Sequence, residues 1–92
     1  MKVKNINGTS QNKCKCGSWL NHWEKFAKKS ASYCSESSCI SKQLVGAHVQ
    51  KADSKDNNWY IIPLCSYHNN HKGELDIGNT ILISANVYET CG

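Results

Sequence analysis

Residues 34–72 read CSESSCISKQLVGAHVQKADSKDNNWYIIPLCSYHNNHK, and this stretch decides the fold. Two pairs of metal-binding side chains bracket it, Cys34 with Cys39 at the start and Cys65 with His68 near the end. Zinc binds four such thiolate and imidazole groups in a tetrahedron. Residues three apart at the start of a helix lie on one face, so the spacing of the second pair suits a helix N-terminus. The spacing predicts a zinc site built from these four residues.

The sequence between the two pairs predicts a β-hairpin. Residues 43–50 (QLVGAHVQ) form the first expected strand, in which the glycine permits close approach of another backbone. Residues 59–64 (WYIIPL) predict a second strand that ends at Pro63, and the polar residues 51–58 form the turn. A helix is expected after this strand and stops near Gly73. The expected fold is a small α+β zinc-binding domain with a treble-clef core.

Three further segments extend this core. Residues 18–29 (SWLNHWEKFAKK) place apolar side chains on one face at helical spacing and predict an amphipathic helix with serine as its N-cap. Residues 80–84 (TILIS) predict a short third strand. Residues 1–13 are polar and without period, which predicts a loose polar arm. Residues 14–92 are then one zinc-stapled domain.

Composition favours a bound metal over disulfide bonds as the cross-link that stabilises this small domain. The chain has 92 residues, six cysteines and a mean hydropathy of -0.57. Domains of this size bury a modest core and often need such a staple. The N-terminus lacks the apolar region and cleavage site of a secretory signal, and no stretch has the length of a membrane span. We therefore expect a cytoplasmic protein with reduced thiols, the alternative being three disulfides or buried inert thiols.

Four more potential ligands lie outside the predicted site. They form a second set of four that would tie the N-terminal helix to the C-terminus, so one or two zinc ions are expected. The histidine of this set also lies near the apolar face of its helix, where it would simply pack. Pairing of an N-terminal cysteine with the C-terminal one is a further alternative. The residues are Cys14, Cys16, His22 and Cys91.

A histidine-bearing strand, GAHV at 46–49, precedes the string YIIPLC at 60–65 and the tripeptide HNN at 68–70. Together these segments resemble the HNH (ββα-metal) nuclease family, over roughly residues 34–72. Small HNH-like proteins of this sort are frequent in bacteria and mobile elements. The resemblance implies a zinc-binding protein that cuts DNA with the help of a divalent metal.

The resemblance also implies roles for individual residues. His48 matches the general base that takes a proton from the attacking water. Cys65 and His68 match the structural zinc ligands at the helix start. Asn69 matches the position of a ligand to the catalytic metal, and its amide oxygen is a hard ligand suited to Mg²⁺ or Mn²⁺. His71, two residues further on, is the candidate substitute for this ligand.

Two features favour a catalytically silent protein instead. Ala47 stands where active members of the family offer a carboxylate or a second histidine to the metal. The net charge of +4 comes from eleven lysines and no arginine, so phosphate would be met by point charges without a bidentate fork. The alternatives to a nuclease are a silent zinc module that binds nucleic acid or protein, and a purely structural zinc protein. No pattern sets the oligomeric state. The candidate phosphate-binding lysines are Lys42, Lys51, Lys55 and Lys72.

Overall fold

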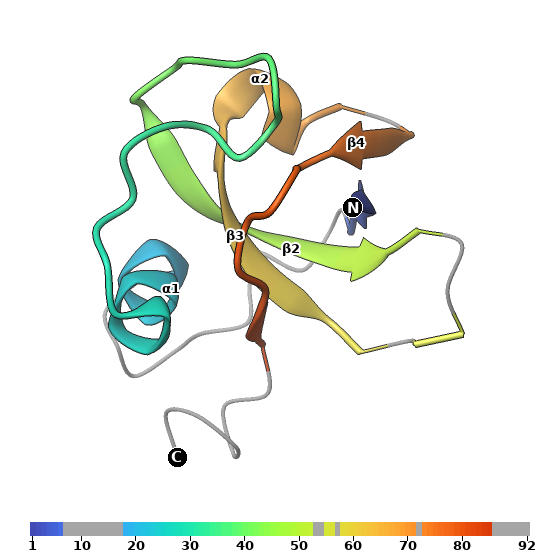
Figure 1. Cartoon of the computed structure of the whole chain (residues 1–92), viewed down its shortest axis with the longest axis horizontal. Coiled ribbons are helices and arrows are strands. Elements are labelled where there is room, and N and C mark those ends of the chain that lie inside the picture. Colours follow the sequence, from blue (N-terminus) through green and yellow to red (C-terminus); the bar gives the residue numbers. More distant parts are fainter. Residues whose placement is uncertain (7–17, 53–54, 57, 72, 86–92) are drawn as a thin grey trace.

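The computed structural model describes residues 1–6, 18–52, 55–56, 58–71 and 73–85. Its elements are β1 (Lys2–Asn5), α1 (Trp19–Ala27), β2 (Leu44–Lys51), β3 (Tyr60–Cys65), α2 (Ser66–Asn69), β4 (Glu74–Asp76) and β5 (Ile83–Ser84). Within the described residues the strands form one antiparallel sheet in the order β4-β1-β2-β3-β5. Helix α1 lies beside the β2–β3 hairpin, and α2 follows β3 at the end where β2 begins (Figure 1). The expected small α+β architecture is confirmed, and neither described helix is long and apolar enough to cross a membrane.

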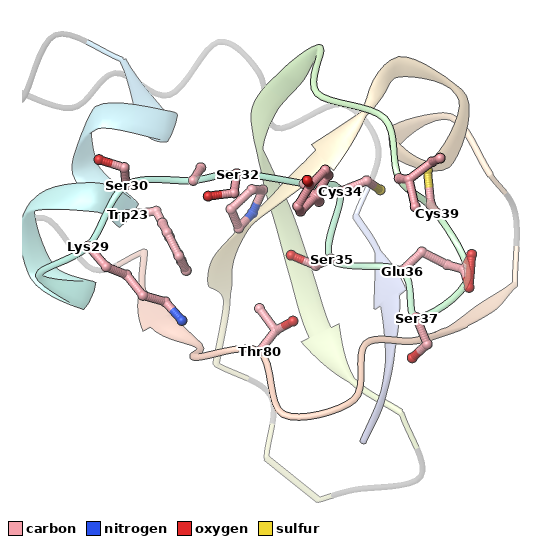
Figure 2. A pocket seen from close by; sticks show the side chains of 14 residues that line it. Trp23, Lys29, Ser30, Ser32, Cys34, Ser35, Glu36, Ser37, Cys39 and Thr80 are labelled. Atoms are coloured by element: carbon pink, nitrogen blue, oxygen red, sulfur yellow. The ribbon is translucent and has the colours of Figure 1, made fainter.

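The β2–β3 hairpin confirms the two predicted strands, and its register places Leu44 opposite Cys65 at one end. Pro63, however, does not end the second strand but lies inside β3. Its carbonyl accepts a hydrogen bond of 2.9 Å from the amide of Ser35, in the segment that passes along this edge of β3 (Figure 2). The N and C=O groups of one residue point to the same side of a strand. The missing N–H of the proline therefore faces away from β2 and costs the hairpin no hydrogen bond.

The two faces of the hairpin have different coverings. Neighbouring side chains in a strand point to opposite faces, and α1 covers the face that carries Gly46. At this glycine the helix backbone is so close that an added Cβ atom would lie 2.3 Å from the carbonyl carbon of Trp19. The close backbone approach expected at the glycine is therefore present. The other face contributes to the main apolar core through Ala47, Val49, Ile62 and Leu64.

Helix α1 confirms the predicted amphipathic helix, and its caps explain its boundaries. The side chain of Ser18 accepts a hydrogen bond of 3.1 Å from the amide of Asn21, which satisfies an N–H group of the first turn. Lys28 ends the helix in the left-handed conformation, with φ at 58°. The indole of Trp23 donates a hydrogen bond of 2.8 Å to the carbonyl of Ile81. This bond ties the helix to the segment that precedes β5.

Strand β1 corrects the prediction of a loose arm over residues 1–13 for the part from Lys2 to Asn5. It lies inside the sheet, paired with β2 on one side and with β4 on the other, and Val3 is fully buried. A four-residue strand with one buried apolar side chain carries too little pattern to be recognised, so its partner strands select it. Residues 7–13 lie outside the described residues. Strand β4 was not predicted either, and the third predicted strand shortens to Ile83–Ser84.

Candidate metal centre

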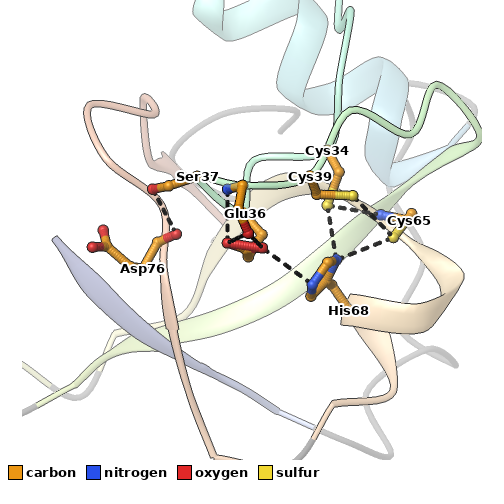
Figure 3. A network of polar contacts seen from close by, with 8 residues as sticks. Cys34, Glu36, Ser37, Cys39, Cys65, His68 and Asp76 are labelled. Carbon is orange, nitrogen blue, oxygen red and sulfur yellow. Dashed lines mark hydrogen bonds and ion pairs between the residues drawn. The ribbon is translucent and has the colours of Figure 1, made fainter.

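Three segments of the chain bring four metal-binding side chains together (Figure 3). Two lie in the connection between α1 and β2, one is the last residue of β3 and one belongs to α2. One donor atom from each, a sulfur or a ring nitrogen, lies within 4.8 Å of all the others. The residues are Cys34, Cys39, Cys65 and His68, the four that the sequence predicts to bind zinc.

The distances between donor atoms fit a tetrahedron around zinc. The Sγ atoms of Cys39 and Cys65 are 3.9 Å apart, and Nδ1 of His68 is 3.3 Å from Sγ of Cys65. The same nitrogen is 3.5 Å from Sγ of Cys34. Zinc–sulfur and zinc–nitrogen bonds of about 2.3 and 2.0 Å predict tetrahedral edges of about 3.5 to 3.8 Å. The three cysteines are free rather than paired in disulfides.

Backbone hydrogen bonds shape the turn that carries Cys34 and Cys39. The amide of Cys34 donates to the carbonyl of Ser41 at 2.9 Å, and the amide of Cys39 donates to the carbonyl of Glu36 at 3.0 Å. The amide of Cys65 donates to the sulfur of Cys34 at 3.3 Å. A hydrogen bond to sulfur stabilises its thiolate form. The hydrogen bond from Cys65 to Cys34 therefore joins the end of β3 directly to the turn, without the help of a metal.

Glu36 orients the imidazole of His68, a role that the sequence did not reveal. Its carboxylate lies 3.3 Å from Nε2 of His68 and also accepts hydrogen bonds of 2.8 Å from the amide and the hydroxyl of Ser38. The amide and then the hydroxyl of Ser38 lower the pKa of Glu36, which keeps it ionised. A carboxylate at Nε2 holds the ring proton there and leaves the lone pair of Nδ1 free to bind metal. Nothing in the string SESS distinguishes this glutamate from a solvated one.

The thiols of the cluster differ in acidity. Burial raises the pKa of Cys34 to about 11, although the amides of Cys65 and Glu36 oppose the shift. Burial also acts to raise the pKa of Cys65, but the amide and imidazole of His68 and the neighbouring thiols outweigh it and lower the pKa to about 7. A divalent cation stabilises all of the thiolates at once and displaces their protons. The cluster is therefore chemically suited to a cation.

His48, the predicted general base, lies beneath α1 and is only 5% exposed. Its ring packs edge-on against the rings of Trp19 and Trp59, at centroid distances of 4.6 and 6.2 Å. Burial, with a smaller effect from His22, lowers the pKa of His48, so its imidazole is neutral at neutral pH. Its Nε2 atom is buried and has no hydrogen-bond partner among the described residues. The protonation state suits a general base, whereas the burial keeps the nitrogen from bulk water.

Asn69 lies in α2 and contacts the face of the sheet opposite to the one that carries His48. The Oδ1 and the backbone carbonyl of Asn69 accept hydrogen bonds from the side-chain amide of Asn5, the first at 3.0 Å. Asn5 is paired with Val49, so its side chain shares the core face, whereas His48 faces α1. His71 lies near α2, with its ring centroid 6.5 Å from that of His68. The structure therefore does not bring His48 and Asn69 together.

Of the second predicted ligand set, the structure describes His22 alone. Its side chain is fully buried and packs against the rings of Trp19 and Phe26. Its Nε2 lies 2.8 Å from the carbonyl of Ser84. This position agrees with the alternative in which the histidine packs on the apolar face of its helix. The other members, Cys14, Cys16 and Cys91, lie outside the described residues.

No protein-family model, curated protein or solved structure matches the chain. The site must therefore be interpreted from its own chemistry. Three thiolates and one imidazole form a donor set that is typical of structural zinc, and the four atoms are close enough to hold the ion. A zinc ion bound by all four donors would have no tetrahedral position left for a substrate or a metal-bound water.

Proposed function

We propose that this chain is a zinc-stabilised module that binds nucleic acid, with the metal in a structural role. The observation that supports zinc is the convergence of four sulfur and nitrogen donors within 4.8 Å. They lie on a turn, at the end of a hairpin and in the helix that follows it, which is the order of a treble-clef core. The resemblance to HNH proteins in this core supports the same assignment. A metal with four protein ligands stabilises the fold and does not take part in a reaction.

The charge of the chain supports nucleic acid as the partner. Eleven lysines outweigh seven acidic residues and give a net charge of +4. A lysine excess attracts polyanions and releases their condensed counterions on binding. Lysine does not provide the planar fork with which arginine reads guanine. The proposed binding therefore depends on the phosphate backbone and is weakly selective for sequence.

Native mass spectrometry before and after chelation tests the metal assignment. We expect the wild type to lose zinc on chelation and the Cys39→Ser variant to carry one zinc fewer, because a three-ligand site binds zinc far more weakly. The matched control is Ile40→Ser, which changes the neighbouring residue, 82% exposed. Equal zinc in Cys39→Ser and wild type would contradict the site. A second zinc that disappears in Cys91→Ser would establish the second ligand set.

The DNA endonuclease remains a second candidate because His48 is neutral and its Nε2 has no partner among the described residues. We nevertheless expect no plasmid nicking above background with Mg²⁺ or Mn²⁺. The reasons are the burial of His48 against the rings of Trp19 and Trp59 and the separation of its side chain from Asn69. The assay compares wild type with His48→Ala and Asn69→Ala at equal zinc content. Nicking by the wild type that is lost in His48→Ala would establish nuclease activity and would contradict the proposal that the module is catalytically silent.

A further inference from the structure

A groove of about 430 Å³ lies beside the metal centre, on the side of α1 (Figure 2). The end of α1 and the segment after it form one wall, and Thr80 lies on the opposite side. Cys34 and Cys39 line the groove at its far end, so the wall there is the turn that the metal would hold in place. A volume of this size is in the range of small-ligand sites. Apart from Cys34 and Cys39, its lining residues are not among the four metal-binding side chains.

Hydroxyl groups, together with one lysine, make up most of the polar lining of this groove. Lys29 is at its α1 end, and its Nζ lies 5.8 Å from the ring centroid of Trp23. Trp23 is almost fully buried and forms part of the lining. Glu36 is the one carboxylate in the lining, and it is already bound to Ser38 and His68. The hydroxyl-bearing residues of the lining are Ser30, Ser32, Ser35, Ser37, Thr80 and Tyr33.

Tyr33 offers an aromatic surface at the rim. It is 52% exposed, although aromatic rings are usually well buried, and Nζ of Lys42 lies 5.6 Å from its ring centroid. A lysine beside an exposed aromatic ring pairs a phosphate contact with a stacking surface for a base. Lys29 and Lys42 are both exposed, which leaves their ammonium groups accessible to an anion. The groove thus combines cations, hydroxyl groups and a stacking surface.

We propose that this groove binds single-stranded nucleic acid, an inference that rests on the proposed nucleic-acid-binding function. Lys29 and Lys42 contact phosphates, and one base stacks on Tyr33. The serine hydroxyls bind phosphate or sugar oxygens, except that of Ser37, which already donates to the backbone carbonyl of Asp76. A base in a duplex is already stacked on both faces, so only an unpaired strand can use the tyrosine. The contacts are made to features that every nucleotide shares. Selectivity is therefore for the single-stranded form and not for sequence.

Fluorescence anisotropy of a labelled twelve-nucleotide oligothymidylate tests this proposal with the zinc-loaded full chain. We expect Tyr33→Ala and Lys29→Glu each to raise Kd by about tenfold, since a stacked base and a phosphate contact are lost. The charge-matched control is Lys4→Glu, at an exposed lysine of β1 that does not line the groove, which should change Kd by about twofold at most. Wild-type affinity should fall steeply between low and physiological salt. The zinc content of each variant, measured by native mass spectrometry, verifies that it is folded.

The outcomes separate the groove from the general function. If the wild type binds while Tyr33→Ala and Lys29→Glu behave like Lys4→Glu, the groove is not the binding site and the nucleic-acid function stands. If a twelve-base-pair duplex binds more tightly than the single strand, and Tyr33→Ala has no effect on it, the single-strand assignment is overturned. If the wild type binds neither probe at low salt, both the groove and the nucleic-acid function are wrong.

Discussion

Removal of zinc by a chelator at neutral pH should unfold the whole domain rather than loosen one loop. Cys34 and Cys65 belong to the main apolar core, and the four ligands connect the turn, β3 and α2. The apparent binding free energy of structural zinc is roughly 10–16 kcal/mol, as large as the total stability of a typical domain. Far-UV circular dichroism and tryptophan emission should both change on chelation and recover when zinc is returned.

A variant that lacks one ligand gives the same result without a chelator. Cys65→Ser should resemble the chelated wild type even in excess zinc, because three ligands cannot hold the ion as four do. Ser66→Ala is the matched control, since it alters the next residue, which is exposed and supplies no ligand. A chelated wild type that keeps its native spectrum and melts cooperatively would contradict the structural role of the metal.

The cluster of three cysteines and one histidine could be predicted from sequence because its members occur as two close pairs. Close pairs impose local geometry, and the intervening segment has the alternation of a hairpin, so folding one unit brings the pairs together. Glu36 could not be found in this way. Its effect depends on the imidazole of His68, which lies thirty-two positions further along the chain, and on Ser38, two positions further along. A residue that acts through such a contact has no spacing of its own to recognise.

The arrangement around the sheet was harder to predict than its strands. Strand β1 is short, and its place between β2 and β4 depends on edges that are distant in sequence. The same difficulty affects the predicted catalytic pair. His48 and Asn69 match family positions in the sequence, but the face that His48 occupies depends on the strand register, and Asn69 lies in helix α2. A shift of one residue exchanges the two faces of a strand, so similarity of short strings does not show that two side chains meet.

The second large effect should come from Gly46→Ala, which we expect to destabilise the fold by about 3 kcal/mol or more. The new Cβ atom would lie 2.3 Å from the carbonyl carbon of Trp19 and 2.4 Å from the amide nitrogen of Leu20. Both are backbone atoms of α1, so no rotation of a side chain relieves the contact and the helix itself must move. Such a movement would also disturb the packing of His22 and Trp23, which are the buried side chains of this helix. Urea unfolding in excess zinc, followed by tryptophan emission, measures the change.

The sign of this change makes the test decisive for the position of α1. At an unhindered site, Gly→Ala usually stabilises a protein by about 0.4–1 kcal/mol, because it restricts the unfolded chain. The φ angle of Gly46 is not in the left-handed region, so backbone strain does not account for a loss. Val45→Ala is the control, since it changes the adjacent side chain, which is 42% exposed, and should cost about 1 kcal/mol or less. A Gly46→Ala variant as stable as the wild type would mean that α1 does not rest on β2 at this point, and that His48 is not covered as described.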